Sequence, residues 1–181
     1  SFAMPERACE IMTHVTEASS DHAGFNSASM PRATTCNAKP DTSVTRNPIR
    51  EDYNPKAVVE ILNRHAEQIV AVRGNCDSDI DVEVLKFPLP KHNEVVVNNR
   101  RLVLTHGDDM DLTKLNLKKG DILLYGHFHR PQLAWSDGIL VLNPGSLTFP
   151  KDDYPHTYMV LDEKEVQLRD LAGRILEVKS I

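Results

Sequence analysis

Residues 122–129 read ILLYGHFH, and the fold and chemistry of the chain can be worked out from this stretch. Its four apolar residues are typical of a short buried strand, which stops at a glycine beside two histidines. The same arrangement, an apolar strand followed at once by a turn or small residue and by His or Asn, occurs three more times. Residues 70–77 read VAVRGNCD, residues 102–108 read LVLTHGD, and residues 140–146 read LVLNPGS.

These strand ends predict a metal site. In open α/β sheets, ligands bind at the carboxyl ends of the strands, so strands lying side by side would bring their polar ends into one cleft. Imidazole nitrogens suit a divalent transition metal, and an amide oxygen adds a harder donor. Each signal alone has an ordinary explanation, because a single His after a strand is usually a satisfied surface or core residue. The hypothesis rests on all four signals, and its candidate ligands are Asn75, His106, His127 and His129.

Other segments supply the elements around these strands. Asn54-Pro55 is typical of a helix start, and Val58, Leu62 and Ala66 give the helix one apolar face. Two hairpins are expected, one turning at Asn98-Asn99 and one at residues 136–138. One helix and roughly eight strands predict a sheet-dominated α/β domain.

The chain changes character near residue 46, which predicts an atypical segment at 1–45 and a folded domain at 46–181. Residues 1–45 contain no leucine, whereas residues 46–181 contain 18. The first segment holds 12 Ser/Thr and seven Ala, and its few apolar residues follow neither a helical nor a strand period. Such a stretch buries too little apolar surface to offset the entropy of ordering it, so we expect it to be disordered or poorly packed.

Composition excludes several classes of protein. The 181 residues carry a net charge of −5 without a Lys/Arg block, which argues against a nucleic-acid groove or an anionic membrane surface. No apolar run is long enough to span a membrane, and no secretory signal is visible. Three widely spaced cysteines, Cys9, Cys36 and Cys76, do not suggest a disulfide framework. We therefore expect a cytoplasmic protein.

The order of the strand-end motifs resembles the later motifs of calcineurin-like metallophosphoesterases, and their spacing resembles the YfcE-like bacterial phosphodiesterases. The resemblance covers about three quarters of the chain, from residue 46 onward. It implies an α/β fold, the four-layer α/β/β/α sandwich, with an atypical or disordered first βαβ unit. It also implies a metal-dependent enzyme that hydrolyses a phosphodiester or other small phosphoester by metal-bound hydroxide. Relatives often self-associate, so a homo-oligomer is one alternative and the sequence leaves the oligomeric state open; neither a membrane nor a nucleic-acid partner is expected.

The resemblance also implies roles for individual residues. Asn75, His106 and His127 would bind a second metal and His129 a first, with Gly126 and Gly145 shaping the floor of the site. Cys76 stands where many relatives have a catalytic His, and Asp77 would be its partner; a small buried hydrophobe is the alternative for Cys76. Two divalent ions are expected, with Mn²⁺ preferred and Zn²⁺, Ni²⁺, Fe²⁺ or Mg²⁺ as alternatives. No organic cofactor is expected.

The first-metal motifs of the family, D-x-H and a later G-D, have no match in this chain. Residues 20–24 read SDHAG without the spacer, His14 has no nearby Asp, and Asp41 follows Pro rather than Gly. One metal site is therefore expected to be incomplete. Two explanations stay open, a shifted reading frame over residues 1–45 or true divergence. The alternative function is a non-catalytic scaffold or binding module, for which the retromer subunit of this fold is the precedent.

Overall fold

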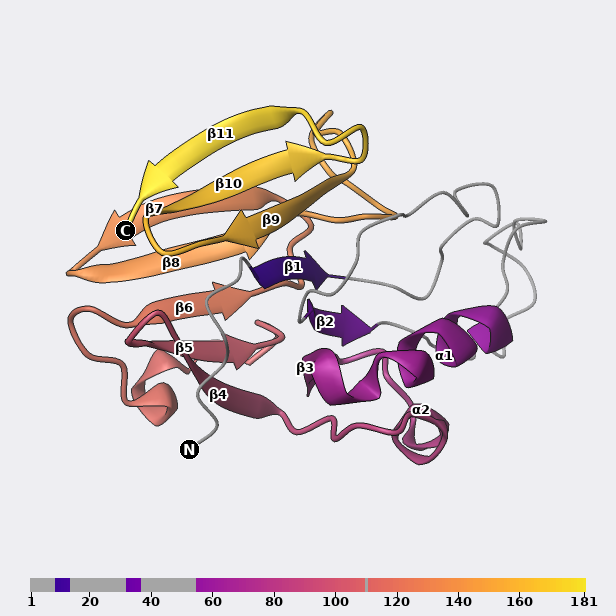
Figure 1. Cartoon of the computed structure of the whole chain (residues 1–181). Coiled ribbons are helices and arrows are strands. Elements are labelled where there is room, and N and C mark those ends of the chain that lie inside the picture. The colour runs from indigo at the N-terminus through magenta and orange to yellow at the C-terminus, as the bar shows by residue number, and fades with distance from the viewer. Residues whose placement is uncertain (1–8, 14–31, 37–54, 110) are drawn as a thin grey trace.

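The computed structural model describes residues 9–13, 32–36, 55–109 and 111–181, and these form two sheets packed face to face (Figure 1). The six-stranded sheet has the order β11-β10-β9-β1-β2-β3, and the five-stranded sheet has the order β4-β5-β6-β8-β7. The strands are β1 (Cys9–Thr13), β2 (Arg32–Cys36), β3 (Ile69–Arg73), β4 (His92–Val97), β5 (Arg100–Thr105), β6 (Ile122–Tyr125), β7 (Pro131–Ser136), β8 (Ile139–Pro144), β9 (Thr157–Leu161), β10 (Glu165–Asp170) and β11 (Ile175–Ser180).

Four helical segments lie within the described residues and connect the strands there. They are α1 (Pro55–Arg64), the 3₁₀ helix η2 (Ala66–Gln68), α2 (Asp79–Val84) and the 3₁₀ helix η3 (Leu112–Leu115). The predicted helix is confirmed as α1, with Val58 and Leu62 buried. The short α2 was not predicted. It begins because Ser78 and Asp81 form a capping box, in which each side chain binds the other residue's backbone N–H.

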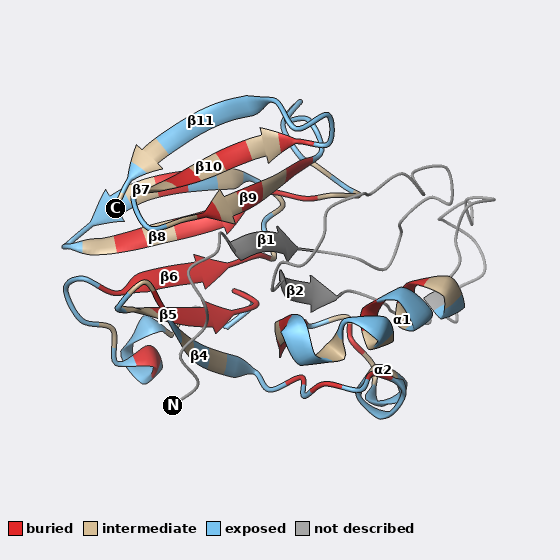
Figure 2. Ribbon diagram, in the orientation of Figure 1, coloured by how far each residue is buried: buried red, intermediate tan, exposed pale blue. Residues whose placement is uncertain are grey.

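Three apolar clusters lie between and outside the two sheets and account for the layers. Figure 2 shows the buried residues in red along the strands. The largest fills the space between the sheets, with side chains from eight of the described strands, such as Leu104, Leu124 and Leu142. A second joins Ile69 and Ala71 of β3 to α1 and to the segment after α2. A third joins the outer faces of β5 and β6 to Leu115 of η3. Helical segments therefore cover an outer face of each sheet, which confirms the metallophosphoesterase type of sandwich.

Both predicted hairpins are confirmed. β4 pairs antiparallel with β5 and β7 with β8, each across a two-residue turn. Asn98 and Asn99 have φ of 51° and 60°, and Asp137 and Gly138 have φ of 50° and 82°. Two successive positive φ values define the turn whose twist matches that of paired strands, and Asn, Asp and Gly are the residues that tolerate it best.

The structure differs from the sequence-based expectation in the N-terminal segment. β1 and β2, five residues each, lie inside the six-stranded sheet, where β1 pairs with β9 and β2 pairs with β3. Strands pair through their backbone N–H and C=O groups. A segment without an alternating apolar pattern can therefore still pair with neighbouring strands whose backbone groups would otherwise be unpaired. The candidate ligands His14, Asp21, His22 and Asp41 lie outside the described residues, and the separate nature of residues 1–45 stays a prediction. Among the described residues, no helix is long and apolar enough to cross a membrane.

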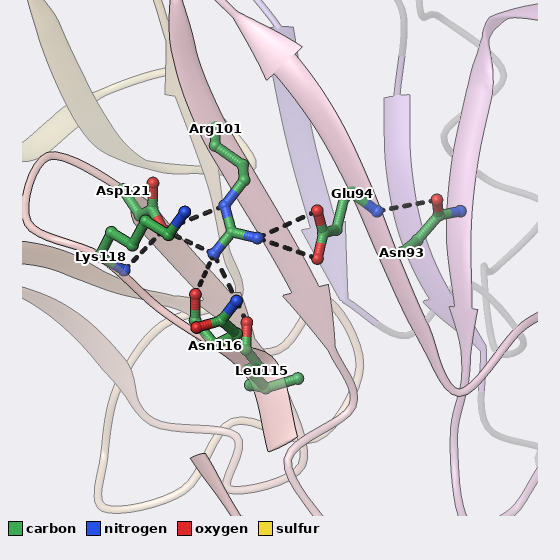
Figure 3. A network of polar contacts seen from close by, with 7 residues as sticks. All are labelled: Asn93, Glu94, Arg101, Leu115, Asn116, Lys118 and Asp121. Carbon is green, nitrogen blue, oxygen red and sulfur yellow. Dashed lines mark hydrogen bonds and ion pairs between the residues drawn. The ribbon is translucent and has the colours of Figure 1, made fainter. Parts of the chain in front are cut away.

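Arg101 fastens the five-stranded sheet at the end opposite the histidines (Figure 3). From β5 it donates to both Glu94 carboxylate oxygens on β4 at 3.1 Å, and to Asp121 Oδ2, before β6, at 3.1 and 2.8 Å. It also donates to the Asn116 carbonyl oxygen at 2.6 Å. Asp121 is only 7% exposed and accepts a further bond from the Lys118 N–H at 2.8 Å. One guanidinium thus joins two strands to the loop that carries η3.

We predict that Asp121→Asn lowers the free energy of unfolding by about 2 kcal/mol at neutral pH, because Arg101 and the Lys118 N–H lose a charged acceptor. Hydrogen bonding from Arg101 lowers the pKa of Asp121. A depressed folded-state pKa contributes stability above the unfolded pKa, and that stability is lost as the pH falls through the folded pKa. The difference between wild type and variant should therefore shrink below about pH 4.

Urea unfolding followed by circular dichroism across this pH range measures the effect. Glu163→Gln, in an exposed turn, is the control and should leave stability unchanged. A deficit in Asp121→Asn that persists undiminished at low pH would contradict the assigned ion pair.

Candidate metal centre

The four motif-bearing strand ends gather at one end of the sandwich, although not in one sheet. β5, β6 and β8 are parallel neighbours in the five-stranded sheet, as expected from the sequence. The condition that all four strands lie side by side does not hold for β3, which belongs to the other sheet. Because the two sheets pack face to face, the end of β3 still reaches the end of β5. Asn75 Oδ1 lies 2.9 Å from His106 Nε2 across the sandwich.

Three of the four predicted metal ligands meet at His106. Its Nε2 lies 2.9 Å from Asn75 Oδ1 and 3.2 Å from His127 Nδ1. Donor atoms bound to one ion at about 2.1 Å lie about 3 Å apart when they occupy adjacent octahedral positions. The amide oxygen and two imidazole nitrogens are therefore spaced as one side of a coordination shell would require.

Burial holds His106 in the protonation state that a metal ligand needs. Its side chain follows β5 directly and is 1% exposed. Burial lowers the pKa of His106 to about 4, and the nearby His127 and His129 act in the same direction against Asp108. Neutral imidazole is the form that coordinates metals. The sequence argument treated this residue as a cleft ligand, whereas the structure shows that it is also part of the packed interior.

The loop after β6 places two histidines in an uncommon backbone conformation. His127 and His129 both have φ of 59°, in the left-handed region that residues other than glycine rarely adopt. Such strain costs about 1–3 kcal/mol a residue and collects at functional sites. His129 does not join the Asn75 cluster through a described contact. Its Nδ1 donates to the Phe149 carbonyl oxygen at 2.7 Å, which fixes the orientation of the ring.

Two residues that the sequence argument did not assign to the site hold this loop in place. Asn143 is fully buried, donates to the Gly126 carbonyl oxygen at 2.8 Å and accepts from the Gly145 N–H at 3.0 Å. Ser146 Oγ accepts from the Phe149 N–H at 2.8 Å, so it fixes the residue whose carbonyl binds His129. The sequence signal was present in the NPGS run, which was interpreted as one of the four strand-end signals, with Gly145 shaping the floor of the site.

Position 145 requires a glycine for a steric reason. Its φ is 80°, and a Cβ there would collide with Thr157 Oγ1 and press on Pro131. The Thr157 hydroxyl donates to the Pro144 carbonyl oxygen at 2.8 Å, so it cannot easily move away. Glycine at this position keeps β9 against the end of β8, next to the histidine loop.

The predicted catalytic pair lies in the turn after β3. Asp77 is buried, and its Oδ2 accepts from the Gly74 N–H at 2.6 Å, which closes the turn that carries Asn75. Burial raises the pKa of Asp77 to about 7, against the opposing effect of the Gly74 bond. Within the described part of the chain, Asp77 Oδ1 is buried without a hydrogen-bond partner. Cys76 is half-buried. Their catalytic roles stay predictions.

The donor set fits one half of a metal centre. Across the described ranges, no three His, Cys, Asp or Glu side chains lie close enough together to hold a metal by themselves. The cluster contains two imidazoles and one amide, a set that suits a borderline ion such as Mn²⁺, Fe²⁺ or Zn²⁺ when water or substrate completes the shell. The Asp and His that the family motifs D-x-H and G-D would add have no match in the sequence of this chain.

Comparison with known proteins agrees with this geometry. Residues 51–166 match the calcineurin-like phosphoesterase superfamily domain. Phosphodiesterase YfcE of Escherichia coli strain K12 is 41% identical over 119 residues, which is 65% of this chain and 65% of that protein. The chain thus matches just under two thirds of the length of this relative.

Solved structures extend the likeness over nearly the whole fold. The structure described as YfcE, a phosphoesterase from E. coli, superposes with a TM-score of 0.80 at 28% identity, covering 97% of this chain and all of the other. Vacuolar Protein Sorting 29 from Cryptosporidium parvum superposes with a TM-score of 0.56 at 20% identity over 96% of each chain, which shows the fold alone. The strand-end motifs, the sandwich and the domain match together show that this chain belongs to the calcineurin-like phosphoesterase superfamily.

Proposed function

We propose that this protein is a metal-dependent phosphodiesterase. The observation that carries the proposal is the cluster of Asn75 Oδ1, His106 Nε2 and His127 Nδ1, at 2.9 and 3.2 Å, where strands of both sheets end. The family membership and the YfcE likeness support hydrolysis of a phosphoester. Which metal acts, how many ions bind, and the diester preference belong to the proposal.

Each residue has a distinct task in this proposal. Divalent ions would supply Lewis-acid activation of water and of a phosphoryl oxygen, and the strand-end ligands would hold them. Asn75, His106 and His127 form one set of ligands, while His129, whose ring is oriented by the bond from Nδ1 to Phe149, would belong to the other. Asn143 and Ser146 are not ligands in this proposal; their hydrogen bonds hold the loops that position the histidines. Cys76 and Asp77 lie beside Asn75, where a group that protonates the leaving oxygen is needed.

The same reasoning limits the class of substrate and the kind of partner that the proposal includes. A site at the strand ends suits a small phosphoester, and the sequence, with a net charge of −5, holds no Lys/Arg block for binding a nucleic acid. A cytoplasmic location stays a prediction from the cysteine count. A chain that bound no metal and turned over no phosphoester would instead fit the non-catalytic scaffold that the sequence left open.

We predict that turnover of a chromogenic phosphodiester requires an added divalent metal, with Mn²⁺ the most effective, because the ligands are imidazoles and an amide rather than thiolates. Protein treated with EDTA and then desalted should be inactive and should regain activity when Mn²⁺ is added. Undiminished hydrolysis after complete removal of metal, verified by elemental analysis, would rule out this function.

We predict that His127→Ala abolishes both activity and binding of Mn²⁺ measured by calorimetry, because one of three clustered donors is lost. The side chain is only partly buried, so the melting temperature should change little. His65→Ala, between α1 and η2, is the matched control and should bind Mn²⁺ as wild type does. His106→Ala should also lose Mn²⁺, with a larger loss of stability because its ring is buried. Equal behaviour of all three variants would disprove the cluster.

We predict that Cys76→His raises hydrolysis of a phosphomonoester by roughly 10²-fold in the metal-loaded protein, because an imidazole can protonate the leaving oxygen. The buried Asp77 Oδ1, without a partner in the described part of the chain, is the group that would orient such a ring. Cys76→Ser serves as the control. An unchanged rate in protein shown to carry its metal would assign Cys76 to packing.

A further inference from the structure

Phe128 is an exposed aromatic residue that lies between two of the proposed metal ligands. It separates His127 from His129 in the loop after β6, and it is 42% exposed. Exposed apolar residues are common on proteins and need no function by themselves. Phe128 differs from such a residue because its backbone and its ring are both held in place directly beside the candidate metal centre.

The backbone presents Phe128 from a strained turn. The Phe128 N–H donates to the Gly126 carbonyl oxygen at 2.6 Å, which closes a three-residue turn with His127 at its centre. His127 has a φ of 59°, and so does His129 on the other side of Phe128. A three-residue turn with a positive φ at its centre is rare and strained, and such strain persists only where surrounding contacts hold it. The turn that sets the two imidazoles therefore also sets Phe128.

Two neighbouring rings hold the ring of Phe128. Its centroid lies 5.2 Å from that of His127, with an angle of 83° between the ring planes, and 6.0 Å from that of Tyr125, with an angle of 76°. Aromatic rings at such separations attract one another in this perpendicular arrangement. Tyr125 is packed in turn against Gly107, where a Cβ would lie 3.1 Å from Tyr125 Cδ2. A ring that is already ordered loses little further entropy when a ligand packs on it.

A second exposed aromatic residue adjoins the same loop. The Phe149 carbonyl oxygen accepts from His129 Nδ1 at 2.7 Å, and Phe149 is 51% exposed. Apolar surface therefore borders the proposed ligands, which are themselves polar. A bare phosphate or a small alkyl ester would leave this surface in water, whereas a flat apolar group on the ester would cover it.

We propose that Phe128 stacks against a planar aromatic group of the substrate, so that the site selects aryl or nucleoside phosphoesters over alkyl phosphoesters. The inference rests on the phosphoesterase function proposed above, because the phosphorus must reach the metal ligands while the aromatic group lies on Phe128. Phe128 contacts the organic group rather than the reacting atoms, so it determines specificity through binding. The chemistry it recognises is a π-face, which an aryl group and a nucleobase share.

Calorimetry of the Mn²⁺-loaded protein with phenylphosphonate and methylphosphonate, two analogues that resist hydrolysis, tests this specificity. Phenylphosphonate should bind about tenfold more tightly, which is the size of one aromatic contact. Phe128→Leu keeps an apolar side chain without a ring, so it should reduce this ratio to about twofold and leave the affinity for methylphosphonate unchanged. Phe128→Tyr keeps the ring and should retain the ratio.

Trp135→Leu is the matched control. Trp135 is also 42% exposed, but it pairs with Leu140 near the start of β8, away from the histidine loop, so the ratio should be that of wild type. A second comparison distinguishes the two kinds of ring. Adenosine 5′-monophosphate and ribose 5-phosphate are compared as inhibitors of bis(p-nitrophenyl) phosphate hydrolysis, and stronger inhibition by the nucleotide identifies a nucleobase as the stacked group.

Equal affinity for the two phosphonates together with equal inhibition by the two sugar phosphates overturns the proposal. So does a ratio that survives in Phe128→Leu or that is lost in Phe149→Leu alone. If Phe128→Leu weakens both phosphonates equally and lowers the melting temperature seen by circular dichroism, Phe128 only supports the loop and the proposal fails. Ring preference in a protein that hydrolyses no ester would refute the proposed function and support this recognition, whereas hydrolysis without ring preference would refute this inference alone.

Discussion

The contact between Asn75 and His106 joins the two sheets at the point where the chemistry is proposed, and the site depends on it. Asn75 follows a strand of one sheet and His106 a strand of the other. Their 2.9 Å separation therefore exists only when the sheets are packed at the correct distance. The apolar cluster between the sheets supplies that packing, with side chains from both. A metal bridging these residues would in turn bind the folded state alone, so that ligand binding and sandwich closure stabilise each other.

Local chemistry explains which parts of the fold could be predicted from the sequence. Strands β5, β6 and β8 were identified because each is an uninterrupted apolar run, and the hairpins because Asn98-Asn99 and Asp137-Gly138 favour positive φ. The helix α2 was missed because its alternating pattern, DIDVEV, hides a start that depends on the Ser78 cap. Membership of β3 in the other sheet could not be read from the chain, because it is decided by pairing with strands distant in sequence.

The site shows the same division between local and distant effects. The candidate ligands were visible because they follow their strands directly. The hydrogen bonds that orient them were not, since Asn143 reaches a carbonyl 17 positions away and His129 one that is 20 positions away. The strands β1 and β2 lack any side-chain period, yet they occupy the middle of the six-stranded sheet. Backbone hydrogen bonds to β9 and β3 place these two strands in the sheet, although their side-chain pattern does not predict strands.

The linkage from Ser146 through Phe149 to His129 has a consequence for the timescale of motion at the site. Ser146 Oγ holds the Phe149 N–H, and the Phe149 carbonyl oxygen holds the His129 ring. The ring cannot turn over without breaking the second bond, and the loop cannot peel away without breaking both. Rotation of an exposed side chain normally takes picoseconds to nanoseconds, whereas opening of a hydrogen-bonded loop is slower by orders of magnitude. The imidazole of His129 therefore moves together with the loop backbone. The time for which the ring keeps one orientation is set by how long the loop stays hydrogen-bonded.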